Sequence, residues 1–218
     1  MTLIVYLHPF SSYSQKAITA FYEKEVPFTV KLLDNSEPVA SEFAALWPVK
    51  KFPVAVDEDR LIFEATGIIE YLEARYPGAA RLIPQDPLEA AEVRMWDRFF
   101  DNYIAAPQQQ IVYAVLKGGS ADSEACVPWR RELETAYAVL EKRMAGREWA
   151  AGESFSLADC AAAPMLLYAD WTHPIDPAFK EVRAYRTRLL ARPSYARALD
   201  EARPYRHLFP LGAPEGRD

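Results

Sequence analysis

Hydrophobic residues follow two different patterns along this chain, and the change of pattern divides the sequence into two parts. In the first part, short apolar runs typical of β-strands alternate with stretches in which apolar residues recur at helical spacing. These patterns predict strands over residues 3–7, 26–33, 54–56 and 61–63, and helices over residues 15–25, 37–46 and 68–76. The order β-α-β-α-β-β-α predicts a sheet with at least one right-handed parallel crossover, ending in an antiparallel hairpin.

Beyond residue 77 the pattern is helical. Residues 77–87 contain three prolines, so we expect a first domain over residues 1–77, a linker over 78–87 and an all-helical domain over 88–218. Amphipathic helices are predicted over 88–116, with a kink at Pro107, and over 124–145, 178–190 and 193–203. Ser156 and Asp159 form a capping-box pattern ahead of a further apolar run.

The strand predicted at residues 54–56 is preceded by Phe52 and Pro53. A proline cannot donate a hydrogen bond to a sheet, so it belongs at a strand start or at an edge. If the Phe52-Pro53 bond is cis, the backbone of Phe52 can face outward and pair with an extended peptide as a further strand. The alternative is an ordinary hairpin without a ligand.

Glu64, Ala65 and Thr66 stand at the start of the helix predicted to follow this hairpin. The unpaired N–H groups and the positive dipole end of a helix favour a carboxylate there. Glu64 beside them can pair with an ammonium group. The stretch therefore offers an edge for peptide pairing, an anion site and a partner for a cation. The alternative is a capped helix with a purely structural role.

Composition argues against several classes of function. The 218 residues are half hydrophobic, carry a formal net charge of −6 and contain no Lys/Arg run, which argues against a nucleic-acid partner. No apolar stretch reaches the roughly 18 residues that span a bilayer, and no signal peptide precedes the first strand. We therefore expect no membrane partner and a cytoplasmic location. Cys126 and Cys160 form no CxxC motif and the histidines are isolated, so we expect no metal.

The loop after the first strand carries candidate chemistry. Ser11, Ser12 and Ser14 stand where a helix begins, which is typical of an N-cap and its neighbours. A hydroxyl at this place can instead donate a hydrogen bond to a bound thiolate. Lowering a thiol pKa from ~8.5 to ~6.5 requires about 2.7 kcal/mol. A hydrogen bond to a charged group contributes ~1.5–3 kcal/mol and a helix N-terminus ~0.3–1 kcal/mol, which together suffice without a general base.

The order of these features resembles the cytosolic glutathione transferases over nearly the whole chain. The resemblance is carried by SSYSQKA at 11–17, KFP at 51–53, EAT at 64–66 and the helical second half. It implies a thioredoxin-like N-terminal domain followed by an all-helical C-terminal domain, usually as a homodimer. It also implies glutathione as co-substrate, bound to the first domain, and an electrophile between the two domains, as in detoxification.

Site residues can be carried over from this resemblance. In the serine/cysteine-type members, which include bacterial ones, a serine is followed five positions later by a basic residue, and Ser11 with Lys16 matches this pattern. Ser11 is therefore the catalytic candidate. The glutathione-binding candidates are Ser12, Ser14, Lys51, Phe52, Pro53, Glu64, Ala65 and Thr66.

The resemblance also implies what several of these residues contact. Lys51 matches a contact to the glycine carboxylate, and the backbone of Phe52 matches the group that pairs with the cysteinyl moiety. Pro53 matches a cis proline. Glu64 matches the acidic residue that holds the γ-glutamyl group. Tyr6 resembles the tyrosine of other classes, although a tyrosine within a strand is more typical of a core.

The sequence departs from the family pattern at residue 65, where Ala65 stands in place of the usual serine. Losing one charged hydrogen bond costs about 1.5–3 kcal/mol, or roughly 10- to 150-fold in affinity. Thr66 compensates only if its hydroxyl points at the ligand, so weak glutathione binding or another thiol is an alternative. No cysteine occupies the loop after the first strand, which argues against the glutaredoxin-like members.

The electrophile site is expected beside the helices of the second part. Its candidates are Tyr103, Gln109, Tyr113, Tyr168 and Trp171, although an aromatic stripe at helical spacing is also typical of a core. The first hypothesis is a glutathione transferase that conjugates glutathione thiolate to a small apolar electrophile. The alternatives are a non-catalytic binding or regulatory protein on the same scaffold, and a glutathione-dependent isomerase or peroxidase.

Overall fold

The computed structural model describes residues 3–78 and 80–217. Its N-terminal part is a four-stranded mixed sheet with strand order β2-β1-β3-β4, combined with three helices. The elements are β1 (Leu3–Leu7), α1 (Ser12–Glu23), β2 (Phe28–Leu32), α2 (Val39–Leu46), β3 (Val54–Asp57), β4 (Arg60–Phe63) and α3 (Ala65–Arg75). β1 pairs in parallel with β2 and antiparallel with β3, and β3 pairs antiparallel with β4. The predicted thioredoxin-like order is confirmed.

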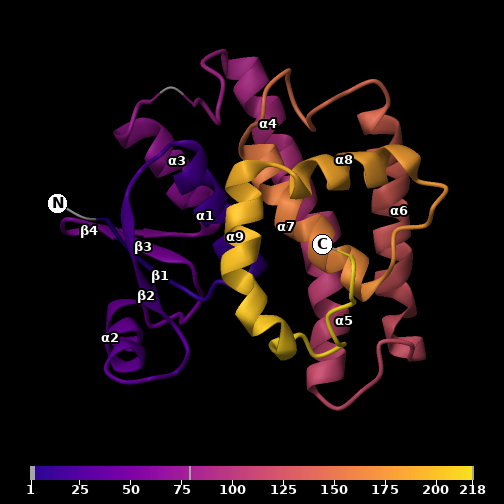
Figure 1. Ribbon diagram of the computed structural model, residues 1–218, viewed down its shortest axis with the longest axis horizontal. Helices are drawn as coiled ribbons and strands as arrows, with labels where there is room; N and C mark the ends of the chain where they lie inside the picture. The colour runs from indigo at the N-terminus through magenta and orange to yellow at the C-terminus, as the bar shows by residue number, and fades with distance from the viewer. Residues whose placement is uncertain (1–2, 79, 218) are drawn as a thin grey trace.

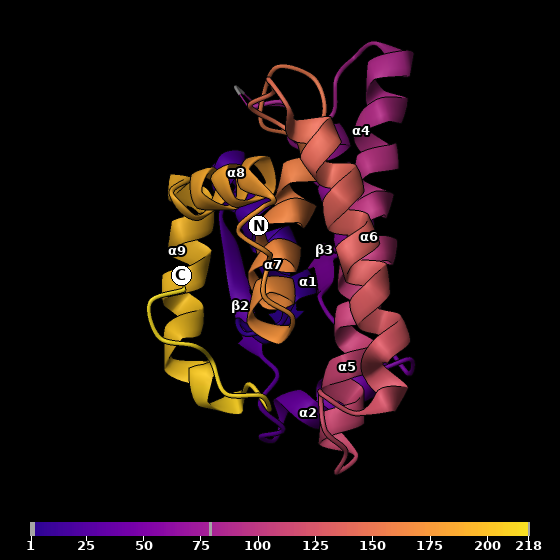
Figure 2. The same ribbon diagram turned by 90° about the vertical axis from the view of Figure 1, so that its right-hand side faces the viewer.

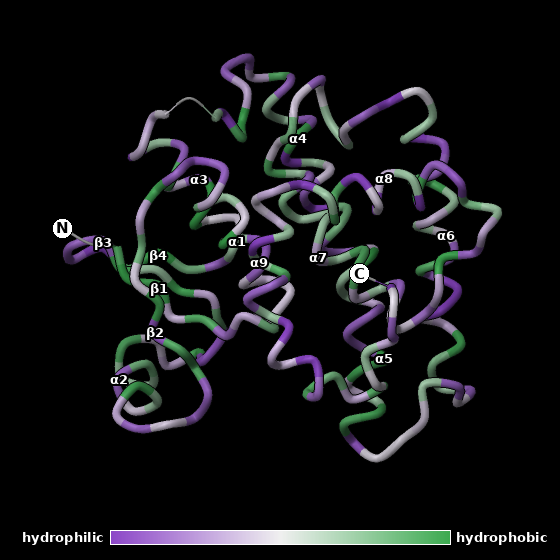
Figure 3. Tube along the Cα trace, viewed as in Figure 1, coloured by the Kyte–Doolittle hydropathy of each residue, from purple (hydrophilic) through white to green (hydrophobic). Residues whose placement is uncertain are grey.

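The two faces of the sheet follow from alternation along β1. Leu3, Val5 and Leu7 are buried in the main core, which also holds the apolar residues of α1 and α3. Tyr6 packs on the opposite face with Phe43 of α2. Figure 1 shows this sheet with α1 and α3 on one side and α2 on the other, beside the helical part. In Figure 3 the strands are mostly hydrophobic and the turn between β3 and β4 is hydrophilic.

The C-terminal part of the described chain is helical. It comprises α4 (Pro87–Phe99), α5 (Ala106–Leu116), α6 (Val127–Met144), α7 (Leu157–Thr172), α8 (Lys180–Leu190) and α9 (Pro193–Ala202), with 3-10 turns at Glu124–Cys126 and Arg203–Leu208. Figure 2 shows α7 between α4 and α6 on one side and α8 and α9 on the other. Within the described ranges, no helix has both the length and the apolar character needed to cross a bilayer.

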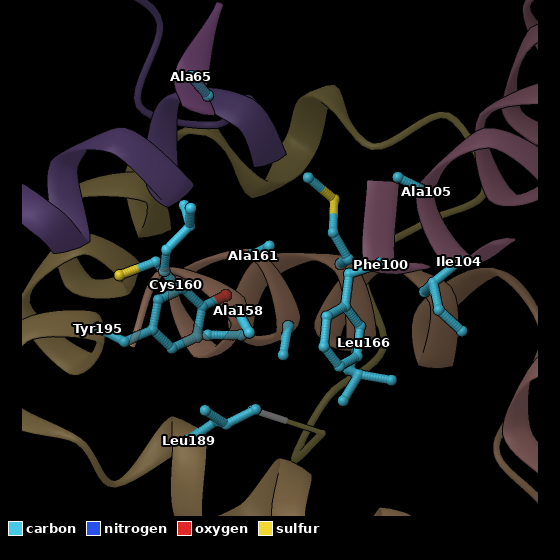
Figure 4. Packing of buried hydrophobic residues seen from close by; sticks show 14 of the residues in the cluster. Ala65, Phe100, Ile104, Ala105, Ala158, Cys160, Ala161, Leu166, Leu189 and Tyr195 are labelled. Carbon is cyan, nitrogen blue, oxygen red and sulfur yellow. The ribbon is translucent and has the colours of Figure 1, made fainter. Parts of the chain in front are cut away.

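Helix α7 is the centre of this part, because its residues from Leu157 to Trp171 are all buried. Small residues such as Ala158 and Ala161 let larger neighbours approach, and Figure 4 shows Phe100, Leu166 and Tyr195 among the residues packed here. The predicted capping box is present at its start. The Asp159 carboxylate accepts from the Ser156 backbone N–H and from the Ser156 hydroxyl, both at 2.9 Å.

The helix predicted over residues 88–116 with a kink at Pro107 is interrupted differently. A π-helical turn, Phe100–Ala105, separates α4 from α5, and Pro107 lies in the first turn of α5. Proline has no N–H to donate to the preceding turn, so it is tolerated at the start of a new helical segment. The irregular turn therefore precedes the proline rather than coinciding with it.

The two parts meet through α1, which packs against α7 and α9. Lys16 of α1 is fully buried at this junction, and its Nζ lies 2.6 Å from Oδ1 of Asp97 and 2.9 Å from Oδ2 of Asp101. A buried ammonium group needs such partners, because desolvation is costly for an unpaired charge. Lys16, which belonged to the predicted catalytic pattern, thus joins the sheet part to the helical part.

Candidate functional site

Residues from both parts of the chain line one cleft of about 380 Å³. They are Tyr13, Trp47, Lys51, Phe52, Pro53, Glu64, Ala65, Arg98, Asp101, Asn102 and Gln109. The structure therefore brings together five of the predicted glutathione-binding residues, which come from the start of β3 and the start of α3. One predicted electrophile-site residue, Gln109 of α5, joins them.

The first wall of the cleft is the segment that leads from α2 into β3. The Phe52-Pro53 peptide bond is cis, and Val54 is the first residue of β3. Lys51 and Phe52 are exposed. Trp47 at the end of α2 stacks on Phe63 of β4, with ring centroids 4.6 Å apart. This stacking supports the edge of the cleft next to the exposed Phe52 backbone.

The second wall is the start of α3. Glu64, immediately before the helix, is exposed and has φ 65° and ψ 132°, an unusual conformation for a residue other than glycine. Strained residues of this kind cluster at functional sites. Ala65 is buried as the first helical residue, and the backbone N–H groups of the first turn have no partner within a helix.

Thr66 does not present a free hydroxyl to the cleft. Its Oγ1 lies 3.0 Å from Oδ2 of Asp97 and is also hydrogen-bonded to Nη2 of Arg98. Both partners belong to α4, so the threonine links α3 to the helical part.

The third wall is the start of α1. Ser11 is the N-cap, and its Oγ accepts a long hydrogen bond of 3.4 Å from the Ser14 backbone N–H. Tyr13, in the first turn, lines the cleft, whereas Ser11, Ser12 and Ser14 are not among the lining residues. Ser14 is fully buried, and its hydroxyl has no hydrogen-bond partner within the described part of the chain.

Sequence reasoning missed Tyr13. Burial raises the pKa of its phenol, and the negative charges of Asp101 and Glu64 raise it further. The phenol is thus a neutral hydrogen-bond donor at physiological pH. The available signal was its place two residues after Ser11, in the first turn of a helix that begins beside a candidate site.

The fourth wall comes from the helical part, and sequence reasoning missed it as well. Arg98, Asp101 and Asn102 line the cleft from the end of α4 and the π-helical turn. Burial raises the pKa of Asp101, while the neighbouring charges of Lys16 and Arg98 act in the opposite direction. The signal was the spacing of three polar residues at i, i+3 and i+4, which places them on one face of the helix.

The other predicted electrophile-site residues have different surroundings. Tyr113 of α5 is 43% exposed and close enough to Tyr13 to raise its pKa. Tyr103 is 59% exposed and contacts Phe99, with ring centroids 5.6 Å apart. Neither is a lining residue of the cleft. Both tyrosines are therefore exposed residues outside the lining of the cleft.

Tyr168 and Trp171 of α7 are buried, and the structure does not bring them to the cleft. Both rings pack against Phe10 and Phe209. The Tyr168 hydroxyl donates to the Phe10 carbonyl at 2.7 Å and accepts from Nε2 of Gln15 at 3.0 Å. These contacts hold the loop before α1 against the helical part.

Tyr6 has the core position that a strand residue was expected to have. It is 4% exposed, and its hydroxyl donates to Oε1 of Glu42 at 2.5 Å. Burial and this hydrogen bond raise the pKa of Tyr6 to about 12. Because Glu42 belongs to α2, the hydroxyl points to the α2 face of the sheet.

Comparisons with known proteins agree with this architecture. Residues 5–80 match the family described as "Glutathione S-transferase, N-terminal domain", and residues 111–193 match "Glutathione S-transferase, C-terminal domain". Glutathione S-transferase F10 of Arabidopsis thaliana is 31% identical over 77% of this chain and 81% of its own length. Glutathione S-transferase-like protein LUC7 of Fusarium sp is 32% identical, but the match spans 66% of this chain and 65% of that protein.

A third relative matches almost end to end. FtsZ-localized protein A of Caulobacter vibrioides is 30% identical over 90% of each chain. The solved structure of FzlA from C. crescentus superposes with a TM-score of 0.82, at 25% identity, covering 100% of this chain and 98% of that one. Two domain matches in the expected order, together with relatives of this identity and coverage, lead to one conclusion. The chain belongs to the cytosolic glutathione S-transferase family.

Proposed function

We propose that this protein is a glutathione transferase in which the thiolate of bound glutathione attacks a small apolar electrophile. The observation that carries the proposal is the convergence of Lys51, the Phe52 backbone, Glu64 and the start of α3 on one cleft. Members of this family typically use glutathione. The three ionic groups of that peptide find complementary groups here, because the cleft offers a cation, an anion and unpaired backbone N–H groups.

In this proposal the peptide lies along the two walls of the sheet part. The ammonium of Lys51 meets the glycine carboxylate, and the carboxylate of Glu64 meets the γ-glutamyl ammonium. The Phe52 backbone, directly before β3, pairs with the cysteinyl residue as a further strand would. The N–H groups at the start of α3 face the γ-glutamyl carboxylate.

The sulfur is placed at the start of α1. The Ser11 hydroxyl is the proposed donor to the thiolate, since its oxygen accepts from Ser14 and its proton stays available. Tyr13 is a second neutral hydroxyl, and it lines the cleft. Ser11→Ala should lower turnover about 10²-fold, as expected for loss of one preorganised donor, whereas Tyr13→Phe should lower it less than tenfold. The reverse result would transfer the role to Tyr13.

The electrophile would meet the sulfur on the side of the helical part, where Tyr13 and Gln109 line the cleft and Tyr113 is close to Tyr13. The direct test combines calorimetry with glutathione and a turnover assay with a model aryl halide. Submillimolar binding together with turnover supports the proposal. Binding without turnover of any aryl halide or peroxide would reject it.

A second candidate is a non-catalytic binding protein on the same scaffold. Ala65 lacks the hydroxyl expected at its position, and one relative that matches 90% of the chain is named for its localization with FtsZ. This function predicts that Ser11→Ala and Lys51→Ala leave a partner interaction unchanged while no thiol substrate turns over. Pull-down with purified FtsZ, compared with a control of equal net charge, is the discriminating measurement.

We also propose that the protein is a homodimer, as the family typically is. Leu88 and Met95 lie two turns apart on one face of α4 and are 82% and 59% exposed. A second copy would cover them. Sedimentation equilibrium should give twice the chain mass, and Met95→Glu should shift the equilibrium toward the monomer.

A further inference from the structure

We propose that Arg98 of α4 is the residue that binds the α-carboxylate of the γ-glutamyl group, in place of the hydroxyl that Ala65 lacks. The inference rests on the proposed function, since it concerns the same cleft and the same ligand. It assigns part of the substrate specificity to the helical part of the chain rather than to the sheet part.

The first observation is the position of Arg98. It lines the same cleft as Glu64 and Ala65, and its side chain is 51% exposed. The charge of Glu64 is close enough to raise the pKa of Arg98, and the charge of Arg98 is close enough to lower the pKa of Tyr13. The guanidinium therefore lies beside the start of α3, where a carboxylate is favoured by the helix dipole and the unpaired N–H groups.

The second observation is how Arg98 is held. Nε donates to Oδ2 of Asp97 at 3.1 Å, Nη2 is hydrogen-bonded to the Thr66 hydroxyl, and Nη2 lies 3.2 Å from Oδ2 of Asp101. Among the described residues, no hydrogen bond of Nη1 is found. Nη2 also donates to Oδ2 of Asp97 at 2.5 Å, so four contacts fix one side of the planar fork, and Nη1 is left to donate to a ligand.

The third observation concerns charge. Lys16 and Arg98 carry two positive charges, and Asp97 and Asp101 carry two negative ones, so the charges of these four side chains cancel. The Asp101 carboxylate is hydrogen-bonded to Lys16, with both of its oxygens 2.9 Å from Nζ. An incoming carboxylate beside Arg98 gains a charge-assisted hydrogen bond from its guanidinium.

Arg98 and Glu64 then form a site for an amino-acid zwitterion. They carry opposite charges, line the same cleft and make no ion pair with each other in the described chain. The carboxylate of the γ-glutamyl group fits the arginine, and its ammonium fits the glutamate. Ligands that lack either group should lose the corresponding contact.

The experiment is calorimetry with three S-methylated peptides, which removes the thiol from the comparison. The probes are S-methylglutathione, its 4-aminobutanoyl analogue without the α-carboxylate, and its glutaryl analogue without the ammonium. Arg98→Gln should weaken the binding of S-methylglutathione about 10- to 150-fold. The affinity for the 4-aminobutanoyl analogue should stay within twofold of the wild-type value. Arg94→Gln is the matched control, because Arg94 lies one turn earlier on α4 and pairs with Glu70 outside the cleft.

Two further variants guard against a purely structural effect. Arg98→Lys keeps the charge and should lose less affinity than Arg98→Gln. In the background of Arg98→Gln, Ala65→Ser should restore affinity for S-methylglutathione at least threefold without changing binding of the 4-aminobutanoyl analogue. Circular dichroism and thermal unfolding of each variant check that the fold is retained.

The outcomes separate the inference from the proposed function. Equal binding of S-methylglutathione by the wild type and Arg98→Gln, or equal weakening of all three peptides, overturns the role of Arg98 alone. If Arg98→Gln selectively weakens the binding of S-methylglutathione but the wild type turns over no electrophile, the role of Arg98 stands and the transferase function alone is overturned. If the wild type binds none of the peptides at millimolar concentration, both are overturned.

Discussion

The buried Lys16 ammonium provides a quantitative test of how the two parts of the chain are joined. Its side chain and that of Asp97 are both 0% exposed, and Asp101 is 12% exposed. Lys16→Met has a similar volume but removes the one fully buried cation of this group, so that Asp97 and Asp101 keep only the half-exposed Arg98. Removing one partner of a buried pair costs about 3–5 kcal/mol. With an m-value of about 3 kcal/mol/M, the urea midpoint should fall by about 1–1.7 M.

The assay is urea unfolding followed by circular dichroism at a fixed protein concentration, because assembly changes the apparent stability. The matched control is Lys31→Met, which removes an ion pair with Glu42 whose side chains are 34% and 42% exposed. An exposed pair contributes about 0–1 kcal/mol, so this midpoint should change by less than about 0.3 M. A fall for Lys16→Met no larger than that of the control would refute the reasoning.

The same substitution has a pH signature. Burial already raises the pKa of Asp101, and loss of Lys16 removes the larger of the two neighbouring charges that lower this pKa. A carboxyl whose folded-state pKa exceeds its unfolded value binds protons preferentially in the folded state. Stability from this group is present at low pH and is lost as pH rises through the folded pKa. The stability gap between Lys16→Met and the wild type should therefore narrow as pH is lowered from 7 toward 4.

Three further predictions concern hydroxyl and carboxyl groups away from the cleft. Tyr6→Phe should keep turnover within twofold in the aryl halide assay, because its hydroxyl donates to Glu42; a hundredfold loss would assign catalysis to Tyr6. Burial raises the pKa of Asp159 to about 6, so the unfolding free energy of the wild type relative to Asp159→Asn should fall by about 2–3 kcal/mol from pH 4 to pH 7. A flat difference in calorimetric scans would contradict that burial effect. Tyr168→Phe should cost about 1–3 kcal/mol in thermal unfolding, because the Phe10 carbonyl loses its donor, and should leave glutathione affinity unchanged.

Most of the architecture was readable from local patterns. Period-two and helical spacings gave the order of strands and helices, and β3, β4 and α3 lie within a few residues of their predicted ranges. Chemistry that acts within a few residues was equally readable. The proline before β3, the helix start after Glu64 and the Ser156–Asp159 capping box depend on backbone donors close along the chain.

Which residues of the helical part line the cleft depends on how distant segments pack together, and the sequence alone did not show it. A residue on one face of a predicted helix looks the same in the sequence whether that face meets a cleft or a core, so the sequence could not separate Gln109, which lines the cleft, from the buried Tyr168 and Trp171. Arg98 became a cleft residue because α4 packs beside α3 through the Thr66 contact. Periodicity reveals which face of a helix is apolar, but the partner of that face depends on contacts between residues far apart in the chain.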